Sequence, residues 1–453
     1  MRRLASLVVA IGIGAANIGG LQPPSRSAPA EGSLFSGDGI VEATLEAPFD
    51  ELFAKSRRDP QATVIGTLRH AGTAIDNVEV SVRGNTSKAG TECSFPKLKV
   101  RLPASVHDTS IFKGIRTLKI GTHCGELPDG QLTSRFGRWA NEKSPLREAF
   151  VYRLLETVKV PALKARPARI TYVDGARTVV RNALFLEDDR EAMVRLGASR
   201  LVAPDEFGDA ARDFTADDTA NLAFGEALIG NFDWCLKFSP DDTYRCDAHR
   251  PLWNVLAYAR VDGQMMPVLD DFDIAGMVTG RHLWFTKVFY DGFSASKSPA
   301  EIEVVSQVQH TRNLFPRAEL DATRQRFMAR KSAVYDAVAA ADLDAGGRKT
   351  IHAYLDSFYA AIATDAAFYV PVVTQPDTAV YLDPGGTRPA CGKDSTAPIG
   401  TPVGQPLAFD GDMEHVAVLD ALWHWAPPAR CDPIHTGPIW IDRRAIGTDF
   451  PVR

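Results

Sequence analysis

Short acidic and amide side chains that could hold a metal recur near the middle of the chain, at Asp233, Asn254, Asp271 and Asp273. Hard cations such as Mg²⁺ and Mn²⁺ take carboxylate and amide oxygens as ligands and keep waters that phosphate can replace. Together these residues predict metal-assisted phosphoryl chemistry. Taken singly, each motif is more often a helix cap or an Asx-turn than a functional site.

Basic residues on a predicted strand could hold the phosphates. Lys97, Lys99 and Arg101 alternate with apolar residues, so the basic side chains share one face. Lys99 is the preferred phosphate-binding residue and Lys97 the second candidate, while a solvated strand face is the alternative. Arg83, in the turn before this strand, could reach a phosphate or cap the turn.

The elements that must position these residues follow from hydrophobic periodicity. Extended runs between residues 40 and 120 predict a small sheet. A helix is predicted from Ser144, with Ser144 as N-cap and Pro145 in the first turn. This helix would carry Glu148 toward a strand lysine, although a surface partner within the helix is the commoner role of such a residue.

Two further strands are predicted around the turn Asp174-Gly175, and they end at Glu187, where an acid could take a hinge role. Beyond them the pattern is mostly helical, with long amphipathic segments over 316–341 and 349–364. A hairpin with the turn Asp262-Gly263 would deliver Asp270-Asp271-Phe272-Asp273 directly after a strand.

The order of these parts is itself informative. A basic sheet, a helix with an acid, two strands, a helical region, an aspartate, an asparagine and a D-x-D follow one another in protein-kinase-like phosphoryl transfer. The sequence therefore predicts an α+β fold, an atypical protein-kinase-like two-lobed fold followed by a small all-β barrel.

At these motifs the chain resembles the CotH family of secreted kinase-like proteins. The resemblance covers roughly residues 75–280. Its motifs are Val82-Arg83-Gly84-Asn85-Thr86-Ser87, the strand 95–102, Ser144-Pro145-Leu146-Arg147, Gly230-Asn231-Phe232-Asp233-Trp234 and Asp271-Phe272-Asp273.

The resemblance implies a fold that transfers the γ-phosphoryl group of ATP, with Mg²⁺ or Mn²⁺, to protein hydroxyls or to itself. Asp233 would be the catalytic aspartate, and Asn254, Asp271 and Asp273 would bind the metals. The implied nucleotide-binding residues are Lys97, Lys99, Arg83, Glu148 and Glu187. No glycine-rich loop covers the phosphates, so the turn 83–87 would take that place.

Composition and charge narrow the class of protein. The chain has 453 residues, 45% of them hydrophobic and 24% charged, which is typical of a globular protein with more than one domain. A formal net charge of -5 offers no basic surplus for a phosphate backbone, which argues against a nucleic-acid partner.

Export is predicted from the first residues and from the cysteines. Residues 1–30 follow the signal-peptide pattern, with an uncleaved anchor as the alternative, so a secreted, periplasmic or cell-envelope location is expected. Six cysteines in an exported chain indicate disulfides. Their spacing favours Cys93–Cys124, Cys235–Cys246 and Cys391–Cys431.

The expected domains are an N-terminal β-rich lobe over 31–140, a mostly helical kinase-like lobe over 141–371, and a β domain over 372–453. The last resembles a bacterial SH3-like module, which implies a cell-wall or envelope ligand. Trp423, Trp425 and Trp440 could form an aromatic surface there, or be buried.

Three functions remain open from the sequence. The first is an exported kinase of the CotH type whose acceptor protein is unidentified. The second is a catalytically silent envelope or adhesion protein that keeps the kinase-like scaffold. The third is a metal-dependent phosphodiester or glycosyl-transfer enzyme, which is suggested by the D-x-D alone.

Overall fold

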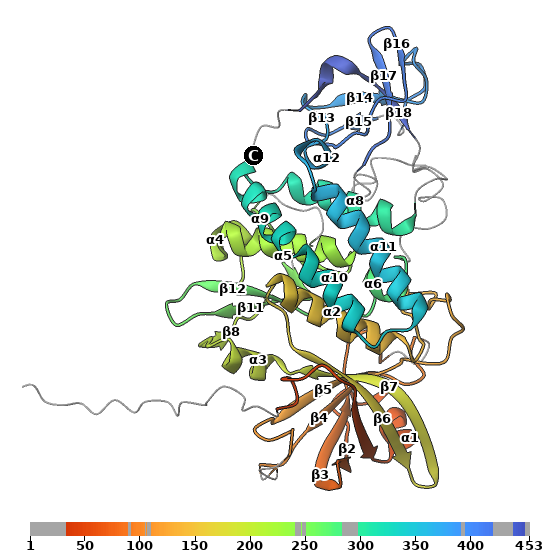
Figure 1. The fold of residues 1–453 in the computed structure, drawn as a ribbon, viewed down its shortest axis with the longest axis vertical. Coiled ribbons are helices and arrows are strands. Elements are labelled where there is room, and N and C mark those ends of the chain that lie inside the picture. The colour runs from red at the N-terminus through yellow and green to blue at the C-terminus, as the bar shows by residue number, and fades with distance from the viewer. Residues whose placement is uncertain are drawn as a thin grey trace, which may run out of the picture.

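The computed structural model shows a mixed α and β protein in which a β-barrel, a helical region and a smaller β-sheet follow one another along the chain (Figure 1). It describes residues 33–88, 92–104, 106, 110–240, 246, 251–282, 298–390, 395–419 and 438–448. The predicted signal peptide lies outside the described residues. The same is true of Cys391, Cys431, Trp423 and Trp425 near the C-terminus.

The barrel closes in the order β1-β2-β3-β4-β5-β7-β6. Neighbouring strands pair antiparallel except β1 and β6, which pair parallel from Val41 opposite Ala168 to Glu46 opposite Val173. The strands are β1 (Val41–Glu46), β2 (Thr63–His70), β3 (Thr73–Val82), β4 (Leu98–Arg101), β5 (Thr117–Gly121), β6 (Ala165–Asp174) and β7 (Arg177–Glu187), with helix α1 (Phe49–Ser56) beside them.

The barrel forms because alternate strand residues are apolar and turn inward. Leu98 and Val100 of β4, and Leu118 and Ile120 of β5, are fully buried in its core. The N-terminal β lobe expected over 31–140 does not close on its own, since β6 and β7 come from residues 165–187 and complete the barrel.

Helix α2 (Ser144–Val158) lies between the barrel and most of the helical region (Figure 1). The predicted N-cap is displaced by one residue: Ser144 is the first helical residue, and its hydroxyl donates a hydrogen bond to the carbonyl of Asn141 at 2.9 Å. The helix ends at Val158, and the residue after it, Lys159, has a left-handed φ of 64°.

Side-chain caps begin several helices of the helical region, and two of these helices, α5 (Ala216–Ile229) and α8 (Pro299–Arg312), are buried on most of their surface. Thr215 caps α5, Ser298 caps α8 and Asp344 caps α11 (Ala345–Ile362), each by accepting a backbone N–H. Its other helices are α3 (Asp189–Arg195), α4 (Ala210–Asp213), α6 (Gly276–Thr279), α9 (Arg317–Ala329), α10 (Lys331–Ala340) and α12 (Asp365–Phe368).

One helix expectation was wrong. The continuous pattern over 316–341 is two helices, α9 and α10, because the chain leaves helical geometry at Arg330, whose φ is -101° and ψ 1°. Phe327 and Val334 are fully buried on either side of this break, so both helices bury their apolar faces in the same core.

Short strands within the helical region flank the polar motifs. The predicted hairpin is present as β11 (Val255–Ala259) and β12 (Met265–Leu269), which pair antiparallel. Gly263 in its turn has a φ of +87°, which favours glycine. The remaining strands are β8 (Arg200–Leu201), β9 (Cys235–Leu236) and β10 (Leu252–Trp253).

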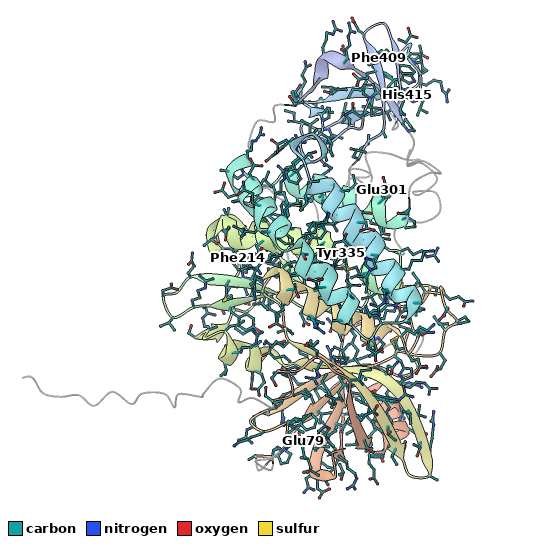
Figure 2. The ribbon with its side chains drawn as sticks, in the orientation of Figure 1. Glu79, Phe214, Glu301, Tyr335, Phe409 and His415 are labelled. Carbon is teal, nitrogen blue, oxygen red and sulfur yellow. A yellow bond between two sulfur atoms is a disulfide. The ribbon has the colours of Figure 1, made fainter. Side chains whose placement is uncertain are left out.

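The C-terminal β-sheet has the order β15-β14-β18-β17-β16, beside the pair β13-β19. Its strands are β13 (Val372–Val373), β14 (Thr378–Tyr381), β15 (Thr396–Ala397), β16 (Ala408–Asp410), β17 (Met413–Val416), β18 (Ile439–Asp442) and β19 (Ile446–Gly447), with the turn η2 (Arg443–Ala445). The rings of His415 and Trp440 stack at 4.7 Å, while Phe409 on the edge strand is exposed (Figure 2). The SH3-like assignment stays a prediction.

Two of the three predicted disulfides are present, Cys93–Cys124 and Cys235–Cys246. They are compatible with the predicted export, because disulfides persist in oxidising compartments. In the part of the chain that the structure describes, no helix is long and apolar enough to cross a bilayer.

Candidate active site

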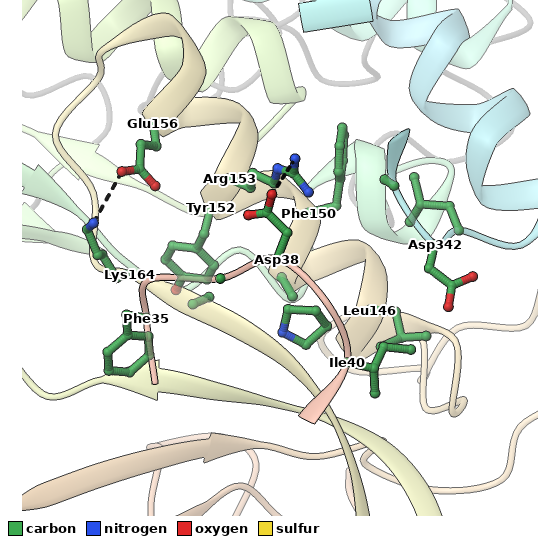
Figure 3. A pocket seen from close by; sticks show the side chains of 16 residues that line it. Phe35, Asp38, Ile40, Leu146, Phe150, Tyr152, Arg153, Glu156, Lys164 and Asp342 are labelled. Atoms are coloured by element: carbon green, nitrogen blue, oxygen red, sulfur yellow. Dashed lines mark ion pairs between the residues drawn. The ribbon is translucent and has the colours of Figure 1, made fainter. Parts of the chain in front are cut away.

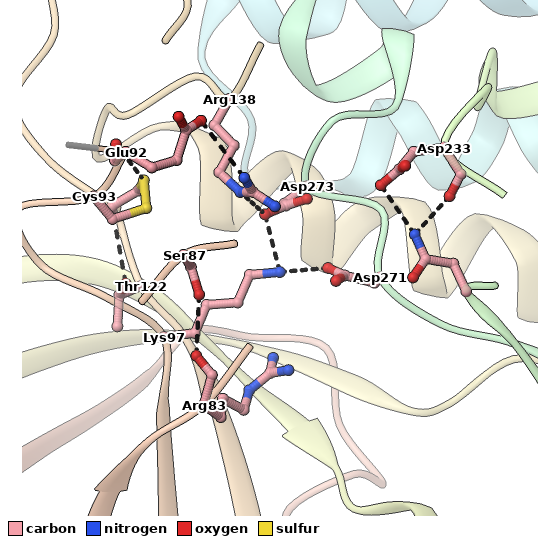
Figure 4. Close-up of polar contacts among 12 residues, drawn as sticks. Arg83, Ser87, Glu92, Cys93, Lys97, Thr122, Arg138, Asp233, Asp271 and Asp273 are labelled. Carbon is pink, nitrogen blue, oxygen red and sulfur yellow. Dashed lines mark hydrogen bonds and ion pairs between the residues drawn. A yellow bond between two sulfur atoms is a disulfide. The ribbon is translucent and has the colours of Figure 1, made fainter. Parts of the chain in front are cut away.

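Lys97 is the centre of a buried charge cluster between the barrel and the helical region (Figure 4). It lies immediately before β4, and its Nζ pairs with the carboxylates of Asp271 and Asp273, the latter at 2.9 Å. The Lys97 side chain is 6% exposed. Burial opposes its charge, but the two aspartates outweigh that effect and raise the pKa of Lys97.

The loop after β12 positions both aspartates. The hydroxyl of Tyr152 on α2 donates to Asp270 Oδ1 at 2.9 Å and accepts from the N–H of Asp271 at 3.0 Å. Phe272 between the aspartates is fully buried against the Tyr152 ring. Asp271 has a left-handed φ of +63°, a strained conformation for a residue with a side chain.

Asp233 lies at the end of the turn that follows α5. Its N–H donates to the side-chain oxygen of Asn231 at 3.0 Å, and Asn231 in turn donates to the buried Glu226 at 2.9 Å. Asn254 donates from its side-chain amide to Asp233 Oδ2 at 3.0 Å, and Trp253 donates to Oδ1 at 3.3 Å. The turn thus presents one carboxylate with defined partners.

Burial, together with the charges of Asp271 and Asp273, raises the pKa of Asp233 to about 6. The hydrogen bond from Trp253 and the charge of Arg138 oppose this rise. A carboxylate with such a pKa is ionised at neutral pH and remains basic enough to accept a proton.

Glu148 of α2 is buried next to Lys97, as its place on the predicted helix suggested. Its Oε1 has no hydrogen-bond partner among the described residues. Burial raises the pKa of Glu148 to about 8, because the opposing effect of Lys97 is too small and Asp273 and Asp271 add to the rise. Lys97 is therefore neutralised by the two aspartates, while Glu148 holds its proton at neutral pH.

Arg138 is a member of this cluster that sequence reasoning missed. Its Nε donates to Asp273 Oδ2 at 2.7 Å, and its side chain is 7% exposed. Burial alone would raise the pKa of Asp273. The charges of Arg138 and Lys97 outweigh burial and hold this pKa well below its usual range. Arg138 belongs to no chemical motif, so the sequence offered no signal for it.

Lys119 on β5 is a second buried lysine that sequence reasoning missed. Its Nζ pairs with Asp189, at the start of α3, and with Asp270 at 3.3 Å. Burial opposes its charge, but Asp270 and Asp189 raise the pKa of Lys119. The available signal was a lysine between two strand residues, Leu118 and Ile120, that are both fully apolar and buried.

Arg83 is a third basic residue near Lys97 and Lys119. Its Nε and Nη2 are buried and have no hydrogen-bond partner within the described part of the chain. The turn that holds it is tight: Gly84 has a φ of +88°, and Ser87 Oγ donates to the Arg83 carbonyl at 3.0 Å. The charge of Arg83 acts on both Lys97 and Lys119.

Lys99 and Glu187 lie apart from the Lys97 cluster. The Lys99 side chain is 43% exposed and pairs with Asp188 at 2.9 Å, so Lys97 and not the preferred Lys99 meets Asp271 and Asp273. Glu187 is buried and accepts from Arg195 Nη2 at 2.7 Å and from the Lys164 N–H at 3.0 Å.

The cluster offers a small set of oxygen donors for a divalent cation. Within the described ranges, no three His, Cys, Asp or Glu side chains are arranged as a metal site. Mg²⁺, however, is commonly held by one or two carboxylates, with phosphate and water completing the shell. Asp271 and Asp273 supply two carboxylates, and Asp273 Oδ1 is buried without a hydrogen-bond partner in the described residues. These residues fit such a cation.

Two surface hollows lie away from this cluster. One is lined by Phe35, Ile40 and Leu146, with the ion pairs Arg153–Asp38 and Lys164–Glu156 at its rim (Figure 3). The other lies beside α1. Neither is lined by Lys97, Asp233, Asp271 or Asp273, so the charge cluster is the stronger candidate for chemistry.

No protein-family model matches the chain, and no curated protein matches it. Among solved structures, the chain is similar to the Helicobacter pylori proinflammatory kinase CtkA, with a TM-score of 0.30 and 8% sequence identity. The similarity covers 58% of this chain and 90% of that chain. The CotH resemblance and the two-lobed kinase arrangement stay predictions.

Proposed function

We propose that this protein is a kinase-like phosphotransferase that moves the γ-phosphoryl group of ATP to a protein hydroxyl, with Mg²⁺ or Mn²⁺. The observation that carries the proposal is the meeting of buried Lys97 with Asp271 and Asp273 beside Glu148. A strand lysine, a helix glutamate and metal-binding aspartates are the parts that kinase-type phosphoryl transfer requires.

The basic residues provide a site for phosphates. Arg83, Lys97 and Lys119 act on one buried group of charges, and Arg83 Nε and Nη2 are buried with no hydrogen-bond partner among the residues that the structure describes. A buried guanidinium without a partner is costly, and phosphate oxygens would satisfy it with charge-assisted hydrogen bonds. In this proposal Lys97 leaves the aspartates when nucleotide binds and moves toward the phosphates and Glu148.

Asp233 would orient the acceptor hydroxyl and accept its proton. Asn254 and Trp253 hold its two carboxylate oxygens, so the side chain has one defined position. A divalent cation, held by Asp271 and Asp273 with Asn254, would supply charge stabilisation for the phosphates. Membership of the CotH type, export, and a cell-wall or envelope ligand of the C-terminal sheet remain parts of the proposal.

The test is phosphate incorporation from γ-labelled ATP into the purified chain and added proteins, with Mg²⁺ or Mn²⁺. Asp233→Asn and Asp271→Asn should each lower the rate at least ~100-fold, as expected for a proton acceptor or a metal ligand. Asp410→Asn, at the exposed edge strand β16, is the matched control and should keep the parental rate.

The pH profile gives an independent check. Since the pKa of Asp233 is about 6, kcat/KM should rise as pH increases through about 6 and then level off. A rate that is unaffected by Asp233→Asn would contradict the proposal.

The second candidate is a catalytically silent kinase-like binding protein. The observation that favours it is that Lys97 and Arg138 already neutralise Asp271 and Asp273. Such a protein would incorporate no label, and neither ATP nor Mn²⁺ would raise its melting temperature. No described feature favours phosphodiester or glycosyl transfer over these two.

A further inference from the structure

A chain of buried polar contacts leads from the Cys93–Cys124 disulfide to Asp273 (Figure 4). Glu92, next to Cys93, is 5% exposed, and its carboxylate accepts the hydroxyl of Thr133. Thr133 Oγ1 in turn accepts the N–H of Arg138 at 2.8 Å. Arg138 Nη1 lies 3.5 Å from Glu92 Oε1. Glu92 therefore contacts the side chain of Arg138 and also Thr133, the residue that accepts the backbone N–H of Arg138.

Arg138 divides the two oxygens of Asp273 into different environments. Oδ2 accepts from Arg138 Nε at 2.7 Å and pairs with Lys97 Nζ at 2.9 Å. Oδ1 is buried and has no hydrogen-bond partner in the described residues. A buried carboxylate oxygen without a partner is unfavourable, and a cation would satisfy it.

The disulfide fixes the start of this chain of contacts. Cys124 Sγ lies 3.6 Å from the carbonyl oxygen of Glu92, and the N–H of Phe95 donates to the carbonyl of Cys124 at 3.1 Å. The segment that carries Glu92 is therefore attached to the segment that follows β5 by a covalent bond and by backbone pairing.

We propose that Arg138 is a positioning residue for the metal site: it holds Asp273 Oδ2 so that Oδ1 stays available to a divalent cation, and disulfide-anchored Glu92 keeps Arg138 in place. The inference rests on the proposed function, since it concerns the cation of that same site. Partners of metal-binding carboxylates typically change metal affinity by about 10- to 100-fold.

The experiment titrates Mn²⁺ into the full chain and follows the electron paramagnetic resonance signal of free Mn²⁺. Arg138→Met should weaken Mn²⁺ binding by about 10- to 100-fold, and Arg138→Lys, which keeps the charge, by less. Arg324→Met is the matched control, because Arg324 is similarly buried in ion pairs with Asp321 and Asp365 within the helical region. It should bind Mn²⁺ like the parent.

Two further variants follow the chain of contacts outward. Glu92→Gln and the double change Cys93→Ser with Cys124→Ser should shift Mn²⁺ affinity in the same direction as Arg138→Met, but less. If the chain has activity, Arg138→Met should raise the Mn²⁺ concentration for half-maximal rate, and saturating Mn²⁺ should restore the rate. A general loss of folding would lower the rate at every Mn²⁺ concentration.

The outcomes separate this inference from the proposed function. If Asp271→Asn abolishes Mn²⁺ binding while Arg138→Met binds like the parent, the positioning role is wrong and the metal site stands. If the parent and Asp271→Asn bind Mn²⁺ equally, or neither binds it, both the metal site and the role of Arg138 are wrong.

Discussion

Protonation of Glu148 is the property of a single residue that most affects how this site responds to pH. Three acids surround Lys97, and one ammonium group cannot neutralise all of them in a buried space. Asp271 and Asp273 contact its Nζ, so Glu148 is the acid that keeps its proton. Glu148 can therefore release its proton when a cation binds at the aspartates, or when Lys97 binds phosphate and moves next to Glu148.

Glu148→Gln tests this assignment. Because the pKa of Glu148 is about 8 in the fold and 4.5 ordinarily, the folded chain keeps a proton that the unfolded chain loses in between. The parental free energy of unfolding should therefore fall between pH ~5 and ~8, by up to roughly 1.4 kcal/mol per pH unit. Above pH ~8 it should stay at the lower value, because Glu148 is then ionised in both the folded and the unfolded chain.

The variant lacks this dependence, so it should gain stability relative to the parent over the same pH window. Denaturant unfolding at pH 5, 6.5 and 8 measures the difference. Glu79→Gln, at an exposed ion pair with Arg101 on the barrel, is the control. Parallel pH profiles for the parent and Glu148→Gln would mean that Glu148 is ionised in the fold.

Residue patterns in the sequence indicated candidate charged residues, but not which of them contact one another. The alternation of the sequence placed Lys97 and Lys99 on one face of a predicted strand, whereas Lys97 lies just before β4, and the approach of the loop after β12 distinguishes the two lysines. Arg138 and Lys119 were missed because tertiary contacts, not local motifs, bring them to the aspartates. The sequence placed Asp233, Asn254, Asp271 and Asp273 in loops because strand and helix ends have short-range signals, and their catalytic and metal-binding roles stay predictions.

At the scale of elements, the turn after α5 depends on a close approach to α11. Gly230 ends α5 with a φ of +63°, and a Cβ there would lie 2.3 Å from the ring of Tyr354. The N–H of Gly276, which begins α6, donates to the Gly230 carbonyl at 3.0 Å. These contacts connect the Asp233 turn to the segment that follows Asp273.

Gly230→Ala should therefore destabilise the protein more than a comparable change elsewhere. Gly263→Ala in the β11-β12 turn is the control, since Gly263 also has a positive φ but has open space around it. The control should cost about 1–2 kcal/mol from backbone strain, and Gly230→Ala a further ~1–3 kcal/mol from overpacking. Chemical denaturation measures both, and equal losses would contradict the tight contact with Tyr354.

The positions of helices, strands and turns were predicted well where glycine, proline or a capping residue marks their ends. The hairpin turn, the helix after Lys143 and the strand pair around Asp174 follow from glycine, proline and capping residues. The break between α9 and α10 was missed because no proline or glycine marks it. Tertiary packing of both apolar faces decides that break.

At the scale of the molecule, the barrel is closed by segments distant in sequence. Strand β1 pairs with β6, which is more than 100 residues further along the chain. Helix α2 lies in the sequence between β5 and β6, so the chain leaves the barrel, forms this helix and then returns to complete the barrel. This closure was not predicted, because parallel pairing between distant strands leaves no local signal. The two described disulfides add covalent links near the candidate active site.

Removing the disulfides should destabilise the fold according to the loops that they close. The Cys93–Cys124 bond spans 31 residues and the Cys235–Cys246 bond 11. Chain entropy predicts losses of about 4 kcal/mol and about 3 kcal/mol for the respective double serine variants. Thermal and denaturant unfolding of the two variants would check the order, and a larger loss for Cys235–Cys246 would show that native contacts dominate.

The left-handed backbone at Asp271 and Asn254, with φ of +63° and +54°, has a consequence for how such a protein evolves. Glycine would relax both positions, so selection for stability alone favours replacing the very residues proposed to bind metal. A lineage under selection for the chemistry must keep Asp and Asn despite the strain. Lineages that abandon it should accumulate glycine there first, which makes these two positions an indicator of retained activity among descendants.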